Sequence, residues 1–401
     1  MLRRQRLAPY PPQTQHCNRR MMAMKITNIN MVLPDSILYG TIEIDNHTIV
    51  SISEGKDSDP NCIDGQGDWL LPGLIELHTD NLEKYFTPRP KVSWPPFSAM
   101  AAHDAQLIGS GITTVLDAVA VGDVRDGGTR QDYLDKMIDT LVESERRGVN
   151  RSQHFLHIRC ELPHSSTYGL VERYLGLPQV KMVSLMDHSP GQRQFVNLEK
   201  YYEYYQGKYG LNDAEMQAYE QEQRTLSQQW SDRNRKAISQ LCHQRGIPLA
   251  SHDDATVAHV EESHELGLVL AEFPTTVEAA KRSHELGLHV LMGAPNVVRG
   301  GSHSGNVAAH ELASMGVLDV LSSDYFPLSL LDAVFKLAED ERNTLDLPNA
   351  VKLATSNPAQ ALGLHDRGEI KEGLLADLIL VKQVEGQAYV KRAWRLGQCV
   401  Y

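Results

Sequence analysis

Six side chains that can bind divalent metals stand at the ends of short apolar segments, or just after them. Two form a His-x-Asp pair behind the run Leu-Pro-Gly-Leu-Ile-Glu-Leu, and the others end four further apolar runs. The six residues are His78, Asp80, Glu161, His188, His252 and Asp324. Neutral imidazoles and carboxylates are common ligands of divalent ions. Any one of these residues alone would be better explained as a surface or core side chain than as a metal ligand. The evidence for a metal site is that all six stand at the end of an apolar segment or just after it. Most other histidines, His103 and His154 among them, are interpreted as ordinary.

A set of this size predicts a centre with two divalent metal ions, with Glu161 as a carboxylate shared between them. Zn²⁺ is the favoured metal, and Mn²⁺ and Fe²⁺ are the alternatives. Two ions about 4 Å apart can share a hydroxide and stabilise both the attacking and the leaving oxygen of a displacement. Metal-bound water has a pKa of about 7, so this nucleophile forms at neutral pH. Asp324 is the candidate catalytic residue, as general base, and also a candidate ligand.

Basic and glycine-rich loops follow several of the same apolar segments. Guanidinium groups bind phosphate oxygens in a fork, and the free amides of glycine-rich loops add donors. The candidate substrate-binding residues are Arg89, Lys91, Arg125, Arg159, Arg193, Arg299 and His303. Arg159 differs from the rest because strand alternation places it on one face with Glu161 and His157. Four such loops on one rim indicate a polyanionic small-molecule substrate, with ordinary surface loops as the alternative.

These side chains can meet only if the apolar segments are strands of one parallel sheet. Between residues 73 and 365, strand-like runs alternate with helical patterns. The expected strands are 74–77, 112–118, 155–162, 182–188, 248–253, 268–273, 289–294 and 317–325. Such alternation predicts an α/β fold, a closed TIM-like (β/α)8 barrel of the metal-dependent hydrolase type. The strand ends of such a barrel converge on one mouth, where its active sites lie.

Three regions do not belong to the barrel pattern. Residues 24–72 and 366–401 show short alternating segments, so both chain ends are expected to build one small β-sandwich domain. Residues 1–23 contain five arginines and no acidic residue, and we expect a disordered extension there. Residues 189–247 are an outsized insertion rich in tyrosine and charge, interpreted either as a lid or partner surface or as a solvated helical excursion.

The composition excludes several classes of partner. A net charge of −12 argues against a nucleic-acid surface. The hydrophobic content of 41% supports a full core, and no apolar run approaches the roughly 18 residues that a membrane span needs. The five cysteines are scattered without metal-type spacing. That pattern favours reduced thiols and a cytoplasmic location.

Several longer motifs resemble a known family. Residues 71–78 (LPGLIELH), 355–359 (TSNPA) and 368–378 (GEIKEGLLADL) are similar to signatures of the amidohydrolase superfamily. Within it, the chain resembles the triphosphate diphosphatases of the carbon–phosphorus lyase pathway from about residue 24 to 401. The motifs that carry this closer resemblance are ELHTDNLEKYFTPRP at 76–90, SLMDHSPGQRQF at 184–195, SHDDAT at 251–256 and MGAPNVVRGGSHSGN at 292–306.

The resemblance implies hydrolysis of a ribosyl triphosphate to the 5-monophosphate and pyrophosphate by metal-activated hydroxide, in phosphonate catabolism. It implies attack at the α-phosphorus, with rim arginines holding the phosphate chain. We also expect a homo-oligomer, a dimer in the first instance, and a functional link to the carbon–phosphorus lyase enzymes.

The chain departs from the wider superfamily at two positions. The usual His-x-His is His78-x-Asp80, and Glu161 stands where many relatives carry a carboxylated lysine. Relatives place their ligands on strands one, four, five, six and eight, whereas the strands expected here place them on one, three, four, five and eight. Either a strand between 118 and 154 has been missed, or one of the strands near 268 and 289 lies outside the ring.

Two other functions compete with the diphosphatase hypothesis. An amide or cyclic-ureide hydrolase, such as a dihydroorotase-like enzyme, would use the same superfamily fold, but the basic loops and the His-x-Asp pair count against it. A catalytically silent barrel that acts as a scaffold is the third alternative. It ranks lower because no expected metal ligand is missing.

Overall fold

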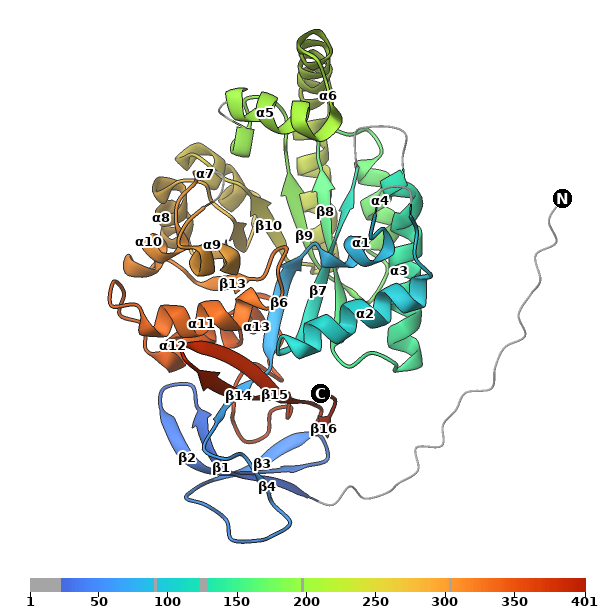
Figure 1. The fold of residues 1–401 in the computed structure, drawn as a ribbon. Coiled ribbons are helices and arrows are strands. Elements are labelled where there is room, and N and C mark those ends of the chain that lie inside the picture. Colours follow the sequence, from blue (N-terminus) through green and yellow to red (C-terminus); the bar gives the residue numbers. More distant parts are fainter. Residues whose placement is uncertain (1–22, 90–91, 123–128, 196–197, 303–304) are drawn as a thin grey trace, which may run out of the picture.

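A nearly closed barrel of eight parallel strands forms the centre of the computed structural model (Figure 1). The structure describes residues 23–89, 92–122, 129–195, 198–302 and 305–401. The barrel strands are β6 (Leu74–Thr79), β7 (Ile112–Val121), β8 (Gln153–Glu161), β9 (Val180–Met186), β10 (Leu249–His252), β11 (Leu270–Glu272), β12 (His289–Gly293) and β13 (Val320–Ser322). They pair in chain order, each parallel to the next. The predicted fold class is confirmed.

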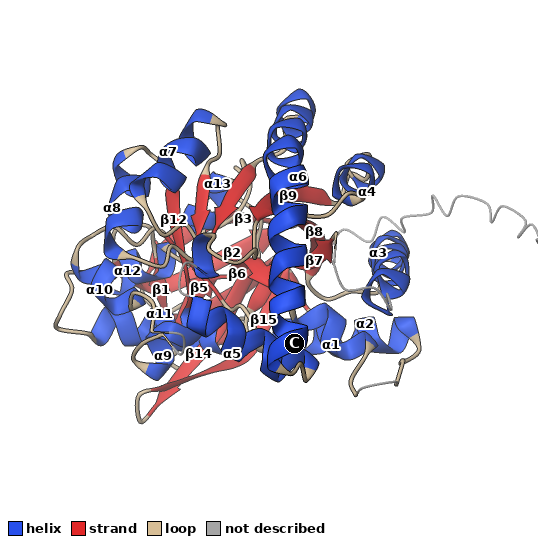
Figure 2. Cartoon of the chain, turned by 90° about the horizontal axis from the view of Figure 1, so that it is seen from above, coloured by secondary structure: helices blue, strands red, loops and turns tan. Residues whose placement is uncertain are grey.

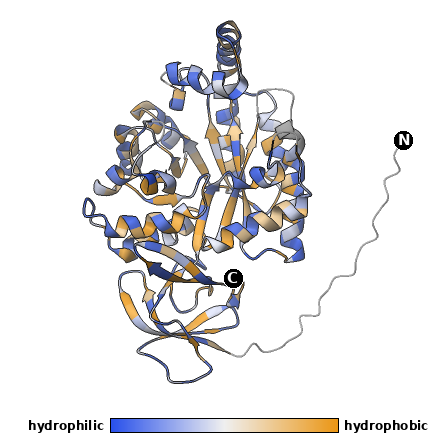
Figure 3. Ribbon diagram, in the orientation of Figure 1, coloured by the Kyte–Doolittle hydropathy of each residue, from blue (hydrophilic) through white to orange (hydrophobic). Residues whose placement is uncertain are grey.

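Helices surround these strands, as Figure 2 shows from above. The helices of the barrel layer are α1 (Asn81–Phe86), α2 (Pro96–Gly109), α3 (Thr129–Arg147), α4 (Thr167–Tyr174), α7 (Val257–Glu265), α8 (Val277–Glu285), α9 (Ala294–Arg299), α10 (Ala309–Ser314), α11 (Ser329–Glu339), α12 (Leu347–Lys352) and α13 (Ser356–Ala361). Figure 3 shows that the barrel strands are largely hydrophobic. Strands buried on both faces read as continuous apolar runs, which is why the sequence revealed them.

The barrel closes between its first and last strands through the residues that follow them. Thr79 and Asp324 form a parallel bridge, and the Asp324 N–H donates to the His78 carbonyl at 3.1 Å. The buried Glu76 carboxylate reinforces the seam, because it accepts from the Ser322 hydroxyl at 2.7 Å and the Ser323 N–H at 2.6 Å. This closure fixes two candidate metal ligands, His78 and Asp324, beside each other.

All eight expected strands belong to the barrel ring, and this corrects both explanations offered for the strand count. In the described residues between β7 and β8 the chain forms α3 and no further strand. Strands β11 and β12 are hydrogen-bonded members of the ring rather than excursions from it. Glu161 and His252 therefore end strands three and five, and His188 lies just after strand four, as the sequence analysis had assigned them.

The two chain ends build one sheet below the barrel (Figure 1). Its strands are β1 (Met24–Val32), β2 (Ile37–Asp45), β3 (Thr48–Glu54), β4 (Ile63–Asp64), β5 (Trp69–Pro72), β14 (Leu378–Val384), β15 (Gln387–Arg395) and β16 (Gln398–Cys399). Alternation divides β14 between two cores. Leu378 and Leu380 join Ile26 and Trp394 in the core of the β unit, whereas Ile379 and Val381 pack against the barrel helices.

The insertion after β9 consists of the short 3-10 turn η1 (Arg193–Phe195), α5 (Leu198–Tyr209) and the long α6 (Asp213–Arg245). A capping box at Asn212 and Glu215 starts α6, and Gly246 ends it in the left-handed conformation. Figure 1 shows α5 above the carboxyl ends of β8 and β9. No helix in the described part of the chain combines the length and the apolar character that crossing a bilayer demands.

A buried polar cluster lies in the outer layer of the barrel, between α2 and the strands β7 and β8. The two oxygens of Asp117 pair with His103 Nε2 at 2.6 Å and His154 Nδ1 at 2.7 Å. The other ring nitrogen of His154 faces Asp104 at 3.3 Å, and Asp104 also pairs with Arg151 at 3.2 Å. Neither histidine was expected to have more than an ordinary role.

Candidate active site

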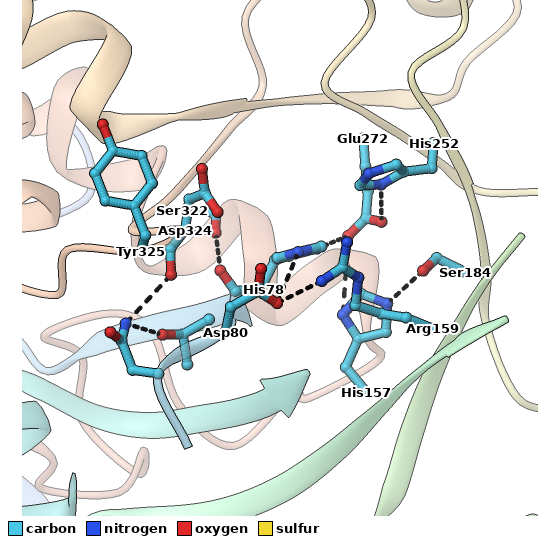
Figure 4. Close-up of polar contacts among 12 residues, drawn as sticks. His78, Asp80, His157, Arg159, Ser184, His252, Glu272, Ser322, Asp324 and Tyr325 are labelled. Atoms are coloured by element: carbon cyan, nitrogen blue, oxygen red, sulfur yellow. Dashed lines mark hydrogen bonds and ion pairs between the residues drawn. The ribbon is translucent and has the colours of Figure 1, made fainter. Parts of the chain in front are cut away.

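One buried carboxylate, Glu272, orients two of the predicted metal-binding histidines. Its oxygens face His78 Nδ1 at 3.0 Å and His252 Nδ1 at 3.3 Å, and the two imidazole rings are stacked with centroids 5.7 Å apart. Figure 4 shows His78 between Glu272 and Asp324. Burial alone would raise the pKa of Glu272, but the surrounding histidines, beginning with His157, hold it well below its usual value. An ionised Glu272 fixes protons on both Nδ1 atoms, so both Nε2 atoms are free to bind a metal.

The neighbourhood of His78 Nε2 contains two of the predicted carboxylates. Asp80 lies 3.8 Å from this nitrogen, and the side chains of His78, Asp80 and Asp324 are grouped closely enough to share one ion. The Asp80 carboxylate also accepts from the Arg159 guanidinium at 2.5 Å. Asp324 has a φ of 52°, a left-handed conformation that is rare outside glycine. Burial raises its pKa.

The third predicted histidine lies between two carboxylates on neighbouring strands. His188 Nδ1 is 2.7 Å from Glu161, and its Nε2 is 3.8 Å from Asp253. Asp253 is also 3.4 Å from His252 Nε2, so His188, His252 and Asp253 form a second compact group. Burial would lower the pKa of His188, but the charge of Glu161 dominates and the pKa rises to about 10.

All six predicted ligands therefore gather at the carboxyl ends of the strands, but their arrangement differs from the expected one. Glu161 pairs with one histidine and belongs to none of the compact groups, so its role as a shared ligand stays a prediction. The sequence reasoning missed Glu272 and Asp253. Both obey the rule that found the others, since Glu272 ends β11 and Asp253 directly follows β10.

The donor set fits divalent cations. Five acidic side chains gather here, and Arg159 is the guanidinium placed among them. The carboxylates are Asp80, Glu161, Asp253, Glu272 and Asp324. Burying such an excess of negative charge costs free energy unless cations offset it. Imidazole and carboxylate donors together suit Zn²⁺, Mn²⁺ and Fe²⁺.

A cavity of about 370 Å³ opens above this group. Its floor contains His78, Asp80, Arg159 and Asp324, and Arg299 lines its side with Gly301 and Ser302. Helices α5 and α6 contribute a part of the wall that consists mainly of aromatic side chains. Those residues are Tyr204, Tyr205, Lys208, Tyr209, Tyr219 and Gln223. The insertion thus forms part of the wall of the site.

The predicted substrate-binding residues separate into three groups. Arg159 and Arg299 line the cavity. Arg193 does not, because its buried guanidinium pairs with Asp254 and with Glu262 at 3.1 Å. Arg89 is exposed and lies outside the cavity wall. Lys91, Arg125 and His303 lie outside the described residues.

Comparisons with known proteins agree with this site. Residues 226–400 match the family described as the amidohydrolase family. The chain is 60% identical over 378 residues to the alpha-D-ribose 1-methylphosphonate 5-triphosphate diphosphatase of Escherichia coli K12, covering 94% of this chain and 100% of that protein.

Solved structures share the fold at much lower identity. A 5-methylcytosine deaminase from Klebsiella pneumoniae superposes with a TM-score of 0.64 at 15% identity, over 94% of this chain and 98% of that one. An N-acetyl-D-glucosamine-6-phosphate deacetylase from Mycobacterium smegmatis gives 0.62 at 18% identity, over 94% and 100%. At these identities the likeness concerns the fold alone.

Proposed function

This chain belongs to the amidohydrolase family, in the branch of its diphosphatase relative, and on that premise we propose that it hydrolyses alpha-D-ribose 1-methylphosphonate 5-triphosphate. The products are 5-phospho-alpha-D-ribose 1-methylphosphonate and pyrophosphate. The observation that carries the proposal is 60% identity over the whole length of that relative. A cavity lined by Arg159, Lys208 and Arg299 above a metal-type donor set is consistent with it. Identity of this extent favours the diphosphatase over the amide or cyclic-ureide hydrolase and over a silent scaffold.

We place one divalent ion at His78, Asp80 and Asp324, and a second at His188, His252 and Asp253, with Glu161 beside the second. When bound, such ions polarise phosphoryl oxygens and make water nucleophilic at neutral pH. Zn²⁺ is the first candidate because three imidazoles are present, and Mn²⁺ and Fe²⁺ are the ones to compare. Glu272 holds the tautomers of His78 and His252 rather than binding substrate.

Asp324 is the general base in this proposal. Water attacks the α-phosphorus, the bond from that phosphorus to the bridging oxygen breaks, and pyrophosphate leaves with the bond's electron pair. Asp324 accepts the proton of the water, because its carboxylate lies at the cavity floor beside His78 and Asp80. The barrel seam fixes its backbone, since the Asp80 N–H donates to the Asp324 carbonyl at 3.2 Å.

Arg299 holds the phosphate chain in this proposal. Its guanidinium lines the cavity, whereas the N–H groups of Gly300 and Gly301 donate to the Val297 and Asn296 carbonyls at 3.2 and 2.8 Å and so end α9. Arg159 acts at the floor, where it offsets the charge of Asp80 and of the α-phosphate. Roles for Lys91, Arg125 and His303 remain sequence predictions.

The cellular setting is also part of the proposal. Cys62, Cys160, Cys242 and Cys399 are free thiols, which supports a reducing cytoplasm. We expect a homodimer, and a functional link to enzymes that supply the ribosyl triphosphate and cleave the carbon–phosphorus bond of the product.

Phosphorus NMR of the metal-loaded protein with this substrate tests the reaction. Pyrophosphate and the 5-monophosphate should appear together, and a chelator should abolish both signals. Inorganic phosphate in place of pyrophosphate would mean attack at the γ-phosphorus. An unchanged spectrum from metal-loaded protein would refute the proposal and revive the amide-hydrolase alternative.

A further inference from the structure

Helix α5 presents one cation to the cavity without a carboxylate partner in the described part of the chain. Lys208 Nζ lies over the rings of Tyr204, Tyr205 and Tyr209, at 5.5, 5.8 and 5.2 Å from their centroids. All four side chains line the cavity. Aromatic faces attract an ammonium group but leave its N–H donors available for a ligand.

A continuous chain of aromatic contacts fixes this wall relative to the metal-binding side chains. The ring of His188 meets Phe195 at 6.1 Å, and Phe195 meets Tyr205 at 5.5 Å. Tyr205 is also near enough to Glu161 for the charge of that carboxylate to act on its hydroxyl. Tyr201 and Tyr219 complete the cluster behind it, with Tyr201 fully buried. The Lys208 surface is therefore a built part of the site.

The substrate proposed above has two different anionic ends. Its triphosphate carries several charges, and the methylphosphonate at C1 carries one charge and an apolar methyl group. Hydrolysis between the α- and β-phosphates requires the α-phosphorus at the cavity floor. The pyrophosphate portion and the ribosyl methylphosphonate must then project from the floor toward different parts of the wall.

We propose that Lys208 and the cavity-lining tyrosines of α5 (Tyr204, Tyr205 and Tyr209) bind the methylphosphonate end, an inference that rests on the proposed function. A single ammonium matches the single charge of the phosphonate, and the ring faces of Tyr204 and Tyr209 match the methyl group and the sugar. Arg299, whose guanidinium can bind phosphate oxygens in a fork, matches the more highly charged pyrophosphate. Lys208 is thus a specificity residue that distinguishes this substrate from other 5-triphosphates.

The test compares two substrates in Lys208→Gln and in the unaltered enzyme. The second substrate is methyl riboside 5-triphosphate, which replaces the phosphonate with a neutral methyl ether. Losing a hydrogen bond to a charged group should raise KM for the natural substrate about tenfold or more, with kcat changed by less than about twofold. The neutral analogue should show no comparable change, and Lys208→Arg should restore most of the affinity.

A matched control is available on α3, where Lys136 lies over the Tyr133 ring at 4.9 Å and does not line the cavity. Lys136→Gln should leave both substrates unaffected. Tyr204→Leu should raise KM for the phosphonate substrate, whereas Tyr204→Phe, which keeps the ring, should not.

Equal losses on both substrates in Lys208→Gln would overturn the inference, because they would assign Lys208 to the triphosphate. No loss on either would overturn it as well. Failure of the unaltered enzyme to release pyrophosphate from either substrate would instead refute the proposed function.

Discussion

The molecule contains two clusters in which a single carboxylate joins two buried imidazoles. At the strand ends Glu272 joins His78 and His252, and in the outer layer Asp117 joins His103 and His154. All six side chains are buried. In both clusters the two carboxylate oxygens are divided between the two histidines. The residue types and local geometry therefore do not distinguish a reaction centre from a structural network.

The clusters differ in what the remaining ring nitrogens face. At the strand ends these nitrogens point toward further carboxylates at the floor of the open cavity, 3.8 Å from Asp80 and 3.4 Å from Asp253. In the outer layer the remaining nitrogen of His154 faces Asp104, which Arg151 and two backbone N–H groups already satisfy. One cluster keeps excess negative charge beside the open cavity, and the other is nearly neutral, with His103, His154 and Asp117 fully buried. Charge balance and access separate the two roles.

Asp324→Asn, at the strand-end cluster, should cause the largest loss of activity among the variants considered. The amide cannot accept the proton of the attacking water, so pyrophosphate release should fall about 10²- to 10⁴-fold. The metal-free protein should unfold at the same temperature or higher, because burial of the Asp324 charge is unfavourable. Phosphorus NMR and thermal unfolding measure the two quantities. Retained activity would exclude Asp324 as the base.

Asp117→Asn should break the outer cluster as a structural element. The buried His154 imidazolium would lose the nearer of its two carboxylate partners and keep only Asp104 at 3.3 Å, so the free energy of unfolding should fall by about 3–5 kcal/mol. Urea unfolding measures this loss, and kcat of the folded fraction should stay unchanged.

The control for that substitution is Asp232→Asn, which removes an exposed ion pair with Lys236 on α6 and should cost about 1 kcal/mol or less. A large loss of kcat in folded Asp117→Asn would show that the outer cluster contributes to the reaction after all.

Glu272→Gln should have a smaller effect, on metal affinity, and tests whether the carboxylate of the strand-end cluster orients metal ligands. An amide can donate where Glu272 accepts, so the orientation of His78 and His252 would be disturbed. Metal affinity should weaken about 10- to 100-fold, as for other outer carboxylates that orient ligating histidines. Competition with a chelator dye measures it. Loss of a whole equivalent of metal would instead identify Glu272 as a direct ligand.

Sequence reasoning predicted the barrel and the six candidate ligands because both follow from local patterns. Apolar runs that end in His, Asp or Glu reveal a strand and its polar end together, and a parallel barrel brings such ends to one mouth. Glu272 was missed because the expected strand ran on to Phe273, past the carboxylate. The same rule would have found Glu272 if the expected strand had ended one residue earlier.

Pairings across long separations were beyond the sequence. Arg193 occupies a loop of the expected kind, but Asp254 and Glu262 from another segment hold its guanidinium. His103 and His154 gave no signal because their common partner, Asp117, lies within an apolar run that reads as plain strand. The strand positions at which relatives carry their ligands were the weakest guide. They suggested a missed or misplaced strand, but all eight expected strands belong to the ring.

The outer cluster should also make the stability of the protein depend on pH, and this is the smallest of the four effects predicted here. Burial would lower the pKa of His154, but Asp117 and Asp104 raise it from 6.5 to about 9. Below the unfolded value the histidine is protonated in both states, and its full contribution to stability is present. Between about pH 6.5 and 9 only the unfolded chain loses the proton, so stability should fall by at most about 1.4 kcal/mol per pH unit. Urea unfolding across this range should show the slope in the unaltered protein, and His154→Gln should reduce it. If the pH dependence of stability is unchanged in His154→Gln, another group titrates in this range, and His154 is not a buried cation of the outer cluster.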